Sequence, residues 1–362
     1  MSDRYIRVQQ AAAEEGLDCL LLTSPASIAY VSGFHAKPYE RLIAALVPVD
    51  GPVCLVVPSL EEEAARAASD GETQFHVWRD EDGPAAALTA ALERPGLRVG
   101  IEKGHLTVQH YELVSSRPRI RLDGCDALIA RLRMAKDPDE LELHRRAAAV
   151  VDRGLARLAS EIRPGRTEAE LASVLTQILP AEGADDVGFA PAVLAGANAA
   201  LPHGSPGRRE LASGDLLIVD IGAAVGGYHA DITRTYVVGA EPDPRQRELF
   251  ELVREAQRAG IAAAKPETPC REIDRAARSV IEAAGLGAHF VHRTGHGLGL
   301  EVHEPPSLHA QNAEPLPEGA VITVEPGVYL PGYGGVRIED DVAVTGSGPE
   351  VLTRAPIGLE VA

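Results

Sequence analysis

Apolar residues in the first part of the chain occur in short runs that alternate with helical patterns. A helical segment at residues 3–15 ends at Gly16, and apolar runs of strand length follow it. Two further helical segments, 60–68 and 85–92, separate the later strands. Strands that alternate with helices predict an α/β domain, which closes near residues 118–130. The expected strands are residues 19–22, 28–31, 42–47, 53–57, 74–78 and 98–101.

A strong helix-start signal at Asp137 marks a second domain. Asp137 is a suitable N-cap, Pro138 suits the first helical position, and Glu140 stands where a capping box requires an acid. Apolar residues then recur at helical spacing. We therefore expect an N-terminal domain over residues 1–130 and a second domain over residues 131–362.

The second domain contains an internal repeat. Pro164 and Pro266 each end one helix, and a helix-start signal follows each of them; the first is a capping box that begins at Thr167. Gly183 and Gly285 both lie nineteen residues after these prolines. The matched positions predict two helix–helix–strand halves. We expect a pseudo-symmetric α+β domain with its site where the halves meet.

Each half carries an apolar strand that ends in an acid. Residues 214–222 read GDLLIVDIG and residues 319–327 read GAVITVEPG, which places Asp220 and Glu325 at the same position of the two frames. A buried acid is costly unless something pairs with it. Two acids in matching frames therefore indicate one shared charged site.

A second acid follows in each half. Asp231 lies eleven residues after Asp220, beyond a glycine-rich turn, so a hairpin can bring the two carboxylates side by side. Glu339 lies fourteen residues after Glu325, and alternation places it on the face opposite Val336. The alternatives are a turn or capping role for Asp231 and a solvated acidic turn around Glu339.

Histidines gather between and before these strands. His292, His296 and His303 occur within twelve residues, set among glycines that allow a close backbone approach to a crowded site. His203 lies in the Pro/Gly-rich loop ALPHGSPG. His203 and His303 are suited to stabilise an oxyanion or to move protons. Taken singly, each also fits a loop histidine without a role.

Four carboxylates and one imidazole form a hard, oxygen-rich ligand set. Such a set disfavours a structural zinc site, which would use Cys and His at short spacings. It suits Mn²⁺, Mg²⁺ or Co²⁺, and four negative charges balance two divalent ions. Two ions about 3.5–4 Å apart would share a water and lower its pKa, which supplies a nucleophile at neutral pH. The pattern therefore predicts a hydrolase with two metal ions.

Composition narrows the partners and the compartment. The chain has 362 residues, 45% of them hydrophobic, and a formal net charge of -18, which disfavours nucleic acid and anionic membranes as partners. The four cysteines are far apart and lack CxxC spacing, as is typical of reduced thiols. The charged N-terminus does not resemble a signal peptide, and no apolar run approaches the roughly 18 residues that span a membrane. We expect a cytoplasmic protein.

The ordered motifs of the second domain resemble the pita-bread metallopeptidase family, which contains methionine aminopeptidase, aminopeptidase P, prolidase and creatinase. The matching pieces are LPHG, VDIG, DITRT, TGHGLGLEVHE, VEPGVY and GGVRIEDD, over roughly residues 137–362. The N-terminal α/β domain is similar to that of prolidases, aminopeptidases P and creatinases. Methionine aminopeptidases lack this domain, so the resemblance favours the other branches.

The resemblance implies a role for each matching residue. Of the five metal ligands, Asp231 and Glu339 would bridge both ions, and Glu325 would also be the acid/base beside the nucleophile. His203 and His303 match the family's catalytic and substrate-contacting histidines. His292 and Arg337 match a histidine of the Xaa-Pro branch and an arginine that orients the carboxylates. The implied ligands are Asp220, Asp231, His296, Glu325 and Glu339.

The resemblance implies hydrolysis of the peptide bond before proline. The first hypothesis is a homodimeric Xaa-Pro dipeptidase (prolidase) with two metal ions, Mn²⁺ in preference to Co²⁺ or Zn²⁺. The second hypothesis is aminopeptidase P, which acts on longer peptides. The stretch at residues 30–42 resembles a prolidase loop that reaches the partner's active site, with Tyr39 where histidine is frequent. Arg41 would bind a substrate carboxylate there or would be an ordinary surface residue. His229 is unusual for the family.

Two alternatives belong to other classes. A binding module without catalysis can use the same fold, although the five intact ligands argue against it. A creatinase-type hydrolase would use the fold without metal.

Overall fold

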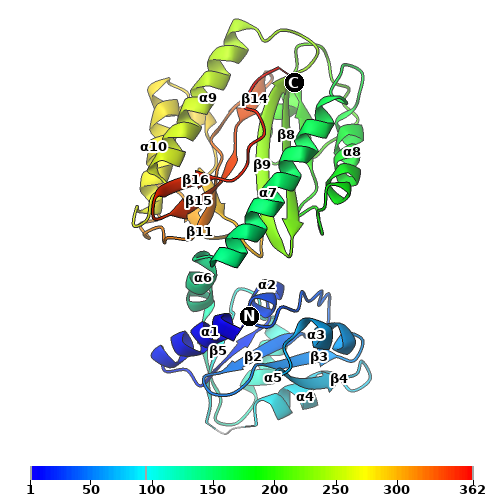
Figure 1. Ribbon diagram of the computed structural model, residues 1–362, viewed down its shortest axis with the longest axis vertical. Coiled ribbons are helices and arrows are strands. Elements are labelled where there is room, and N and C mark those ends of the chain that lie inside the picture. Colours follow the sequence, from blue (N-terminus) through cyan, green and yellow to red (C-terminus); the bar gives the residue numbers. More distant parts are fainter. Residues whose placement is uncertain (1, 94–95, 361–362) are drawn as a thin grey trace. The chain divides into compact units, whose positions relative to one another are not determined.

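The computed structural model describes residues 2–93 and 96–360, and the chain divides into two compact units (Figure 1). The units are Met1–Arg133 and Met134–Ala362. Among the described residues, no helix combines the length and the apolar character that a membrane crossing requires.

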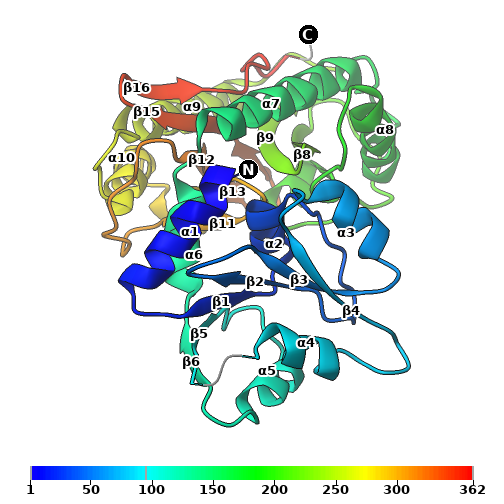
Figure 2. The ribbon, with the colours of Figure 1, turned by 60° about the horizontal axis from the view of Figure 1, so that its bottom comes forward.

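The first unit is a mixed six-stranded sheet with helices on both faces. The strand order is β4-β3-β2-β1-β5-β6, in which β2 runs antiparallel to both of its neighbours and the other pairs are parallel. Helices α4 and α5 lie on one face of the sheet, and α1 and α2 on the other (Figure 2). The strands are β1 (Cys19–Leu22), β2 (Ala44–Pro48), β3 (Cys54–Pro58), β4 (Gln74–Trp78), β5 (Arg98–Ile101) and β6 (Arg121–Gly124). The helices are α1 (Ser2–Glu14), α2 (Pro25–Ser32), α3 (Glu62–Ala68), α4 (Ala85–Ala91), α5 (Val108–Ser115) and α6 (Asp126–Met134).

The α/β class expected for this unit is confirmed, but one expected strand is wrong. The apolar run at residues 28–31 lies in helix α2. The Ser24 side chain caps this helix by accepting a hydrogen bond from the Ser27 amide, and Pro25 occupies the first turn. Residues 26–32 are all buried, so the helix has no polar face and its periodicity cannot be read from the sequence.

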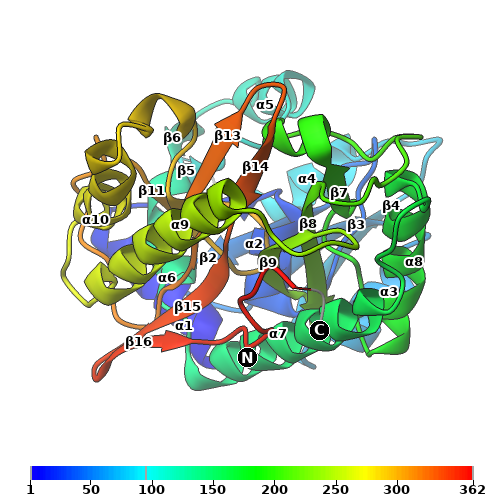
Figure 3. The ribbon, with the colours of Figure 1, turned by 90° about the horizontal axis from the view of Figure 1, so that it is seen from above.

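The second unit repeats one arrangement of helices and strands. Helices α7 and α8 precede the strand that carries Asp220, and α9 and α10 precede the strand that leads to Glu325. The two pairs lie on opposite sides of the unit (Figure 3). The pseudo-symmetric α+β fold is therefore confirmed. The helices are α7 (Pro138–Ala159), α8 (Glu168–Ala181), α9 (Pro244–Ala263) and α10 (Cys270–Ala283), with short 3₁₀ turns η1 (Gly196–Ala200) and η2 (Gly287–His289).

The strands of this unit form three sheets. One has the order β7-β8-β9, one has the order β11-β10-β12-β15-β16, and β13 pairs with β14. The strands are β7 (Ala192–Ala195), β8 (Leu216–Val225), β9 (Tyr228–Val237), β10 (Gly295–Gly297), β11 (Glu304–Leu308), β12 (Val321–Val324), β13 (Gly327–Leu330), β14 (Gly334–Arg337), β15 (Asp340–Thr345) and β16 (Gly348–Val351).

The capping signals read from the sequence are present at two helix starts. Asp137 and Glu140 form a reciprocal capping box at α7, and Thr167 and Glu170 form one at α8. Helix α10 differs, because its cap position is Pro269 and no side chain caps it.

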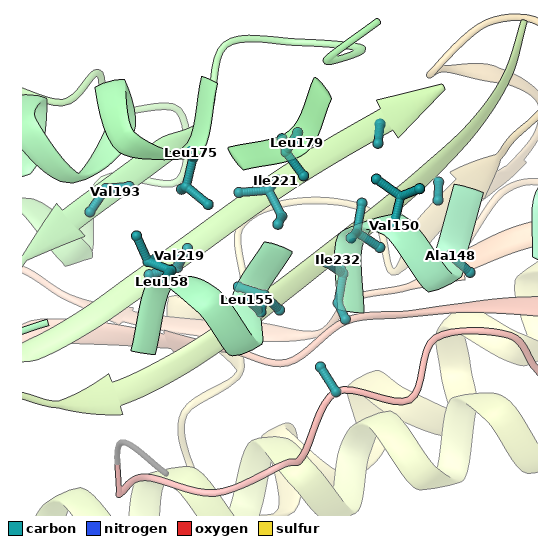
Figure 4. Packing of buried hydrophobic residues seen from close by; sticks show 14 of the residues in the cluster. Ala148, Val150, Leu155, Leu158, Leu175, Leu179, Val193, Val219, Ile221 and Ile232 are labelled. Atoms are coloured by element: carbon teal, nitrogen blue, oxygen red, sulfur yellow. The ribbon is translucent and has the colours of Figure 1, made fainter. Parts of the chain in front are cut away.

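The core under the β8–β9 hairpin is formed by the apolar faces of α7 and α8 (Figure 4). Leu155 and Leu158 of α7 pack with Leu175 of α8 against inward-facing residues of the two strands, such as Val219 and Ile232. Burial of this face holds the hairpin against the helices. The opposite face, which carries the two aspartates, is thereby held in place.

Leu155 is 2% exposed and tests this support. Leu155→Ala should lower the free energy of unfolding by about 2–5 kcal/mol, because it leaves a cavity that the hairpin cannot fill. Leu155→Met keeps most of the volume and should cost less than about 1.5 kcal/mol. Urea unfolding of the two variants checks this; a loss below about 1 kcal/mol for the alanine variant would contradict it.

Candidate metal centre and active site

The β8–β9 hairpin brings Asp220 and Asp231 onto one face. Asp231 lies opposite Gly222, and Asp220 lies opposite Thr233, so the two aspartates are diagonal neighbours. Gly222 has to be glycine, because an added Cβ would lie 2.4 Å from the Phe189 ring. The ring of Phe189 therefore covers the backbone next to both carboxylates.

The second half contributes three side chains from shorter elements. Glu325 directly follows β12, Glu339 lies between β14 and β15, and His296 is the middle residue of β10. An added Cβ at Gly295 or Gly297 would lie about 2 Å from a carbonyl oxygen of a neighbouring strand. The glycines therefore allow β10 to fit between β11 and β12 and to carry the imidazole into the site.

These side chains meet in one place. The His296 Nε2 atom lies 3.4 Å from Glu325 Oε1 and 3.8 Å from Asp231 Oδ2. Ligand atoms of Asp231, His296 and Glu339 all lie within 4.8 Å of one another. The Oδ1 atoms of Asp220 and Asp231 are buried and accept no hydrogen bond from the described residues. Buried oxygens without donors and a neutral imidazole are the donor set that a divalent cation binds, so these residues fit metal.

The electrostatics of the cluster are those of a site built for cations. Burial, reinforced by the neighbouring carboxylates, raises the pKa of Asp231 and of Glu339 well above the usual range. Burial also raises the pKa of Glu325 to about 7, while Arg337 opposes this shift. Burial lowers the pKa of His296 to about 3, which keeps its ring neutral. A bound cation would reverse the carboxylate shifts by stabilising the charged forms.

Arg337 is a cation that the chain itself supplies to the site. Its side chain is buried and donates from Nη2 to Asp220 Oδ2 at 2.5 Å, from Nε to the Thr233 hydroxyl at 3.0 Å, and from Nη1 to the Tyr329 hydroxyl at 2.9 Å. The Thr233 hydroxyl in turn donates to Glu339 at 2.5 Å. The planar guanidinium therefore fixes Asp220 directly and Glu339 through Thr233.

Tyr329 is a site residue that the sequence analysis missed. The Nδ1 atom of His292 lies 2.7 Å from the Arg293 carbonyl, which only accepts, so the neutral ring presents Nε2 as an acceptor. The Tyr329 hydroxyl lies 2.9 Å from that Nε2 and donates to it while it accepts from Arg337. The VEPGVY segment contained this tyrosine, but the sequence gives no sign that its hydroxyl joins His292 to Arg337.

The three consecutive acids at 339–341 are all buried, which excludes a solvated acidic turn. Asp340 pairs with Arg234 at 2.7 Å, and Asp341 accepts the backbone N–H of Asp231 at 3.1 Å. Arg234 also donates to the carbonyl oxygen of Glu339 at 2.6 Å. Asp340 and Asp341 therefore hold residues of the site from behind, and Glu339 alone of the three lines the cavity.

A cavity of about 600 Å³ opens over the acid cluster. His203 and His303 line it as exposed side chains, and the ring of His303 meets that of His296 edge-on at 4.1 Å between centroids. His292 also lines it, and burial lowers the pKa of this histidine to about 4. The apolar part of the wall consists of Phe189, Ala190, Ala192, Pro202 and Val302.

Arg41 belongs to the first unit, whereas the residues described above belong to the second. It donates through Nε and Nη2 to the two carboxylate oxygens of Asp80, at 2.9 and 2.8 Å, and it also pairs with Glu40. Tyr39, in the same loop, is 84% exposed and has a positive φ of 46°. A contact between Arg41 and substrate stays a prediction.

Comparison with known proteins identifies the family. Residues 142–346 match metallopeptidase family M24, and residues 4–135 match the creatinase/prolidase N-terminal domain. The chain belongs to metallopeptidase family M24. It is thus a peptidase of a family that uses divalent metal ions, which argues against both the binding module without catalysis and the metal-free alternative.

Several relatives of this M24 peptidase match nearly its whole length. The probable dipeptidase PepE of Mycobacterium bovis is 38% identical over 97% of this chain and 94% of its own. The crystal structure of dipeptidase PepE from Mycobacterium ulcerans has a TM-score of 0.91 at 35% identity, covering 99% of this chain and 97% of that one. A prolidase from Thermococcus sibiricus has the same TM-score at 34% identity, covering 98% and 97%.

The hydroxyl of Tyr329 provides a test of the network around Arg337. Tyr329→Phe should reduce metal affinity or peptidase activity by about 10- to 100-fold, because Arg337 and His292 each lose a partner beside the ligands. The control is Tyr333→Phe, since the Tyr333 hydroxyl makes no hydrogen bond with the described residues. Metal titration and steady-state kinetics of both variants measure this effect. Equal metal affinity and equal activity in the two variants would contradict a role for the Tyr329 hydroxyl.

Proposed function

We propose that this protein hydrolyses the peptide bond before proline with two divalent metal ions, as an Xaa-Pro dipeptidase. The observation that carries the proposal is the convergence of four carboxylates and one neutral imidazole on a single cavity. Asp220, His296 and Glu325 would each serve one ion, with Glu325 and His296 on the same one. Asp231 and Glu339, which lie within reach of the same point as His296, would serve both.

The metal ions, when bound, would polarise the scissile carbonyl and make water acidic enough to attack at neutral pH. Glu325, which lines the cavity beside His296, would take a proton from the attacking water. Thr323 donates to Glu325 Oε1 at 3.1 Å and so fixes the orientation of this carboxylate.

The histidines of the cavity wall would act on the substrate. His303, held edge-on against His296, and His203, in the loop at residues 201–204, are both exposed to the cavity. From these positions they would stabilise the negative charge that develops on the carbonyl oxygen and deliver a proton to the leaving nitrogen. His292, whose two ring nitrogens are engaged by Arg293 and Tyr329, would support the wall through its ring.

Proline specificity would come from the apolar side of the same cavity. The ring of Phe189 and the side chains of Pro202 and Val302 offer a small apolar surface beside the acids. A pyrrolidine ring buries apolar area against such a surface without leaving an unpaired N–H group, because proline has none. The names of the dipeptidase and prolidase relatives support this choice of substrate class.

The length of the substrate separates the dipeptidase from the alternative, aminopeptidase P. Ala-Pro and Ala-Pro-Ala should be compared at equal enzyme and metal concentrations. We expect the larger kcat/KM for Ala-Pro, because the carboxylate of a dipeptide offers a charge that Arg41 of a second subunit in a homodimer would bind. A larger kcat/KM for the tripeptide would contradict the dipeptidase proposal and favour aminopeptidase P.

Metal binding tests the ligand set directly. The wild type, freed of metal and reconstituted with Mn²⁺, Co²⁺ or Zn²⁺, should bind about two ions per chain. Asp231→Ala and Glu339→Ala should bind fewer ions and lose peptidase activity, whereas Asp139→Ala, at an exposed acid in α7, should behave as wild type. Elemental analysis with activity assays measures both; full metal content in either bridging-site variant would refute the ligand assignment.

A further inference from the structure

His229 lies at the end of the β8–β9 hairpin where two separate walls of the cavity are attached. It is paired with Ala224 across the hairpin, two residues before Asp231 and on the same face of β9. It does not itself line the cavity. Its contacts nevertheless reach both the wall that carries His303 and the wall that carries Phe189.

The first wall is the irregular segment 298–303 between β10 and β11. The carbonyl oxygen of Gly299 accepts two hydrogen bonds from His229, one from the backbone N–H at 2.9 Å and one from Nδ1 at 3.1 Å. Because a carbonyl only accepts, this contact places the proton on Nδ1. The segment lacks regular hydrogen bonding of its own, so its position depends on such anchors.

A buried ion pair fixes the same segment from its other end. Lys136 donates from Nζ to Glu304 Oε1 at 2.8 Å, and the two side chains are 0% and 2% exposed. The Glu304 carboxylate lies directly against Gly299, where an added Cβ would be 2.2 Å from Oε1. The His229 contact and the ion pair therefore meet at Gly299, and His303 lies between them in the chain.

The second wall is the segment that leads to Phe189. The backbone of Ala224 exchanges hydrogen bonds with this segment: it accepts from the Asp185 N–H and donates to the Asp186 carbonyl, both at 2.8 Å. Next to it the edge of the His229 ring packs on Gly188, where an added Cβ would be 3.2 Å from Cδ2. The same imidazole thus contacts Gly299 with one edge and Gly188 with another.

The backbone of His229 is itself held from the helix side. The buried His144 of α7 lies with Nδ1 2.8 Å from the His229 carbonyl oxygen and donates to it. Movement of the His229 ring is therefore restricted at its base as well as at its edge. A ring held in this way acts as a spacer of fixed size between two segments that have little regular structure.

From these contacts we infer that His229 is a positioning residue for substrate recognition, which sets the distance between the His303 wall and the Phe189 wall. The inference rests on the proposed function, because it concerns the same cavity. It makes the specificity of the cavity depend on a side chain that touches neither metal ligand nor substrate.

Three variants at this position test whether both contacting edges of the ring are needed. Asn keeps atoms near the Nδ1 and Cδ2 positions, which contact Gly299 and Gly188; Gln places an amide nitrogen near Nε2 instead, and Ala removes both contacts. We expect His229→Asn to keep KM for Ala-Pro within about 3-fold of wild type. His229→Ala and His229→Gln should raise KM by about 10- to 100-fold with a smaller change in kcat and with unchanged metal content. Loss of folded protein would instead lower kcat and leave KM unchanged.

Hydrogen exchange supplies a readout that needs no activity. Amides of segments 185–189 and 298–304 should exchange faster in His229→Ala than in wild type, with metal and without it, and His229→Asn should resemble wild type. If the alanine variant fails to fold, the comparison of His229→Asn with His229→Gln still tests the inference. Wild-type KM and exchange in His229→Ala, or equal damage in Asn and Gln, would overturn the inference. A wild type that cleaves no Xaa-Pro peptide would refute the proposed function, while the exchange experiment would still test the spacer.

Discussion

The mutual repulsion of four carboxylates in one buried cavity is the constraint on which the catalytic unit depends. At close range in a medium of low dielectric, like charges repel by several kcal/mol, and burial adds a desolvation cost to each of them. The raised pKa values of Asp231 and Glu339 express this cost. Such a cluster persists only if rigid elements hold the acids in place and cations balance them.

The chain meets the first requirement for Asp220 and Glu339 with hydrogen bonds that restrict their carboxylates. Arg337 donates hydrogen bonds to Asp220, Thr233 and Tyr329. The Thr233 hydroxyl in turn donates to Glu339 and so restricts its carboxylate. A second group of interactions supports these hydrogen bonds: Arg234 pairs with Asp340 and donates a hydrogen bond to the Glu339 carbonyl oxygen. The chain's own hydrogen bonds therefore hold Asp220 and Glu339 in place, and ions bound there would balance their charge.

Sequence reasoning was successful where a pattern has a local cause. The capping boxes at Asp137 and Thr167, the acid-bearing strands and the hairpin that joins Asp220 to Asp231 follow from short-range rules. It failed at residues 28–31, because a helix buried on all sides looks like a buried strand. It also missed the roles of Tyr329 and Arg234. Tyr329 is hydrogen-bonded to Arg337, 8 positions away, and Arg234 to the carbonyl oxygen of Glu339, 105 positions away. Side-chain contacts of this kind produce no pattern in the sequence.

The two halves share a layout but contribute differently to the site. The first half presents short aspartates from the middle of a long hairpin, where packing on α7 and α8 fixes the backbone. The second half presents longer glutamates from strand ends and links, where a longer side chain has to cover the remaining distance. His303 and Phe189 come from irregular segments that depend on a few anchors, such as Gly299 and Ala224. The rigid strands and helices of the two halves thus position the carboxylates, whereas the irregular segments attached to them position the residues for substrate recognition. Substitutions at those anchors are consequently the ones that can change substrate preference while the metal ligands stay in place.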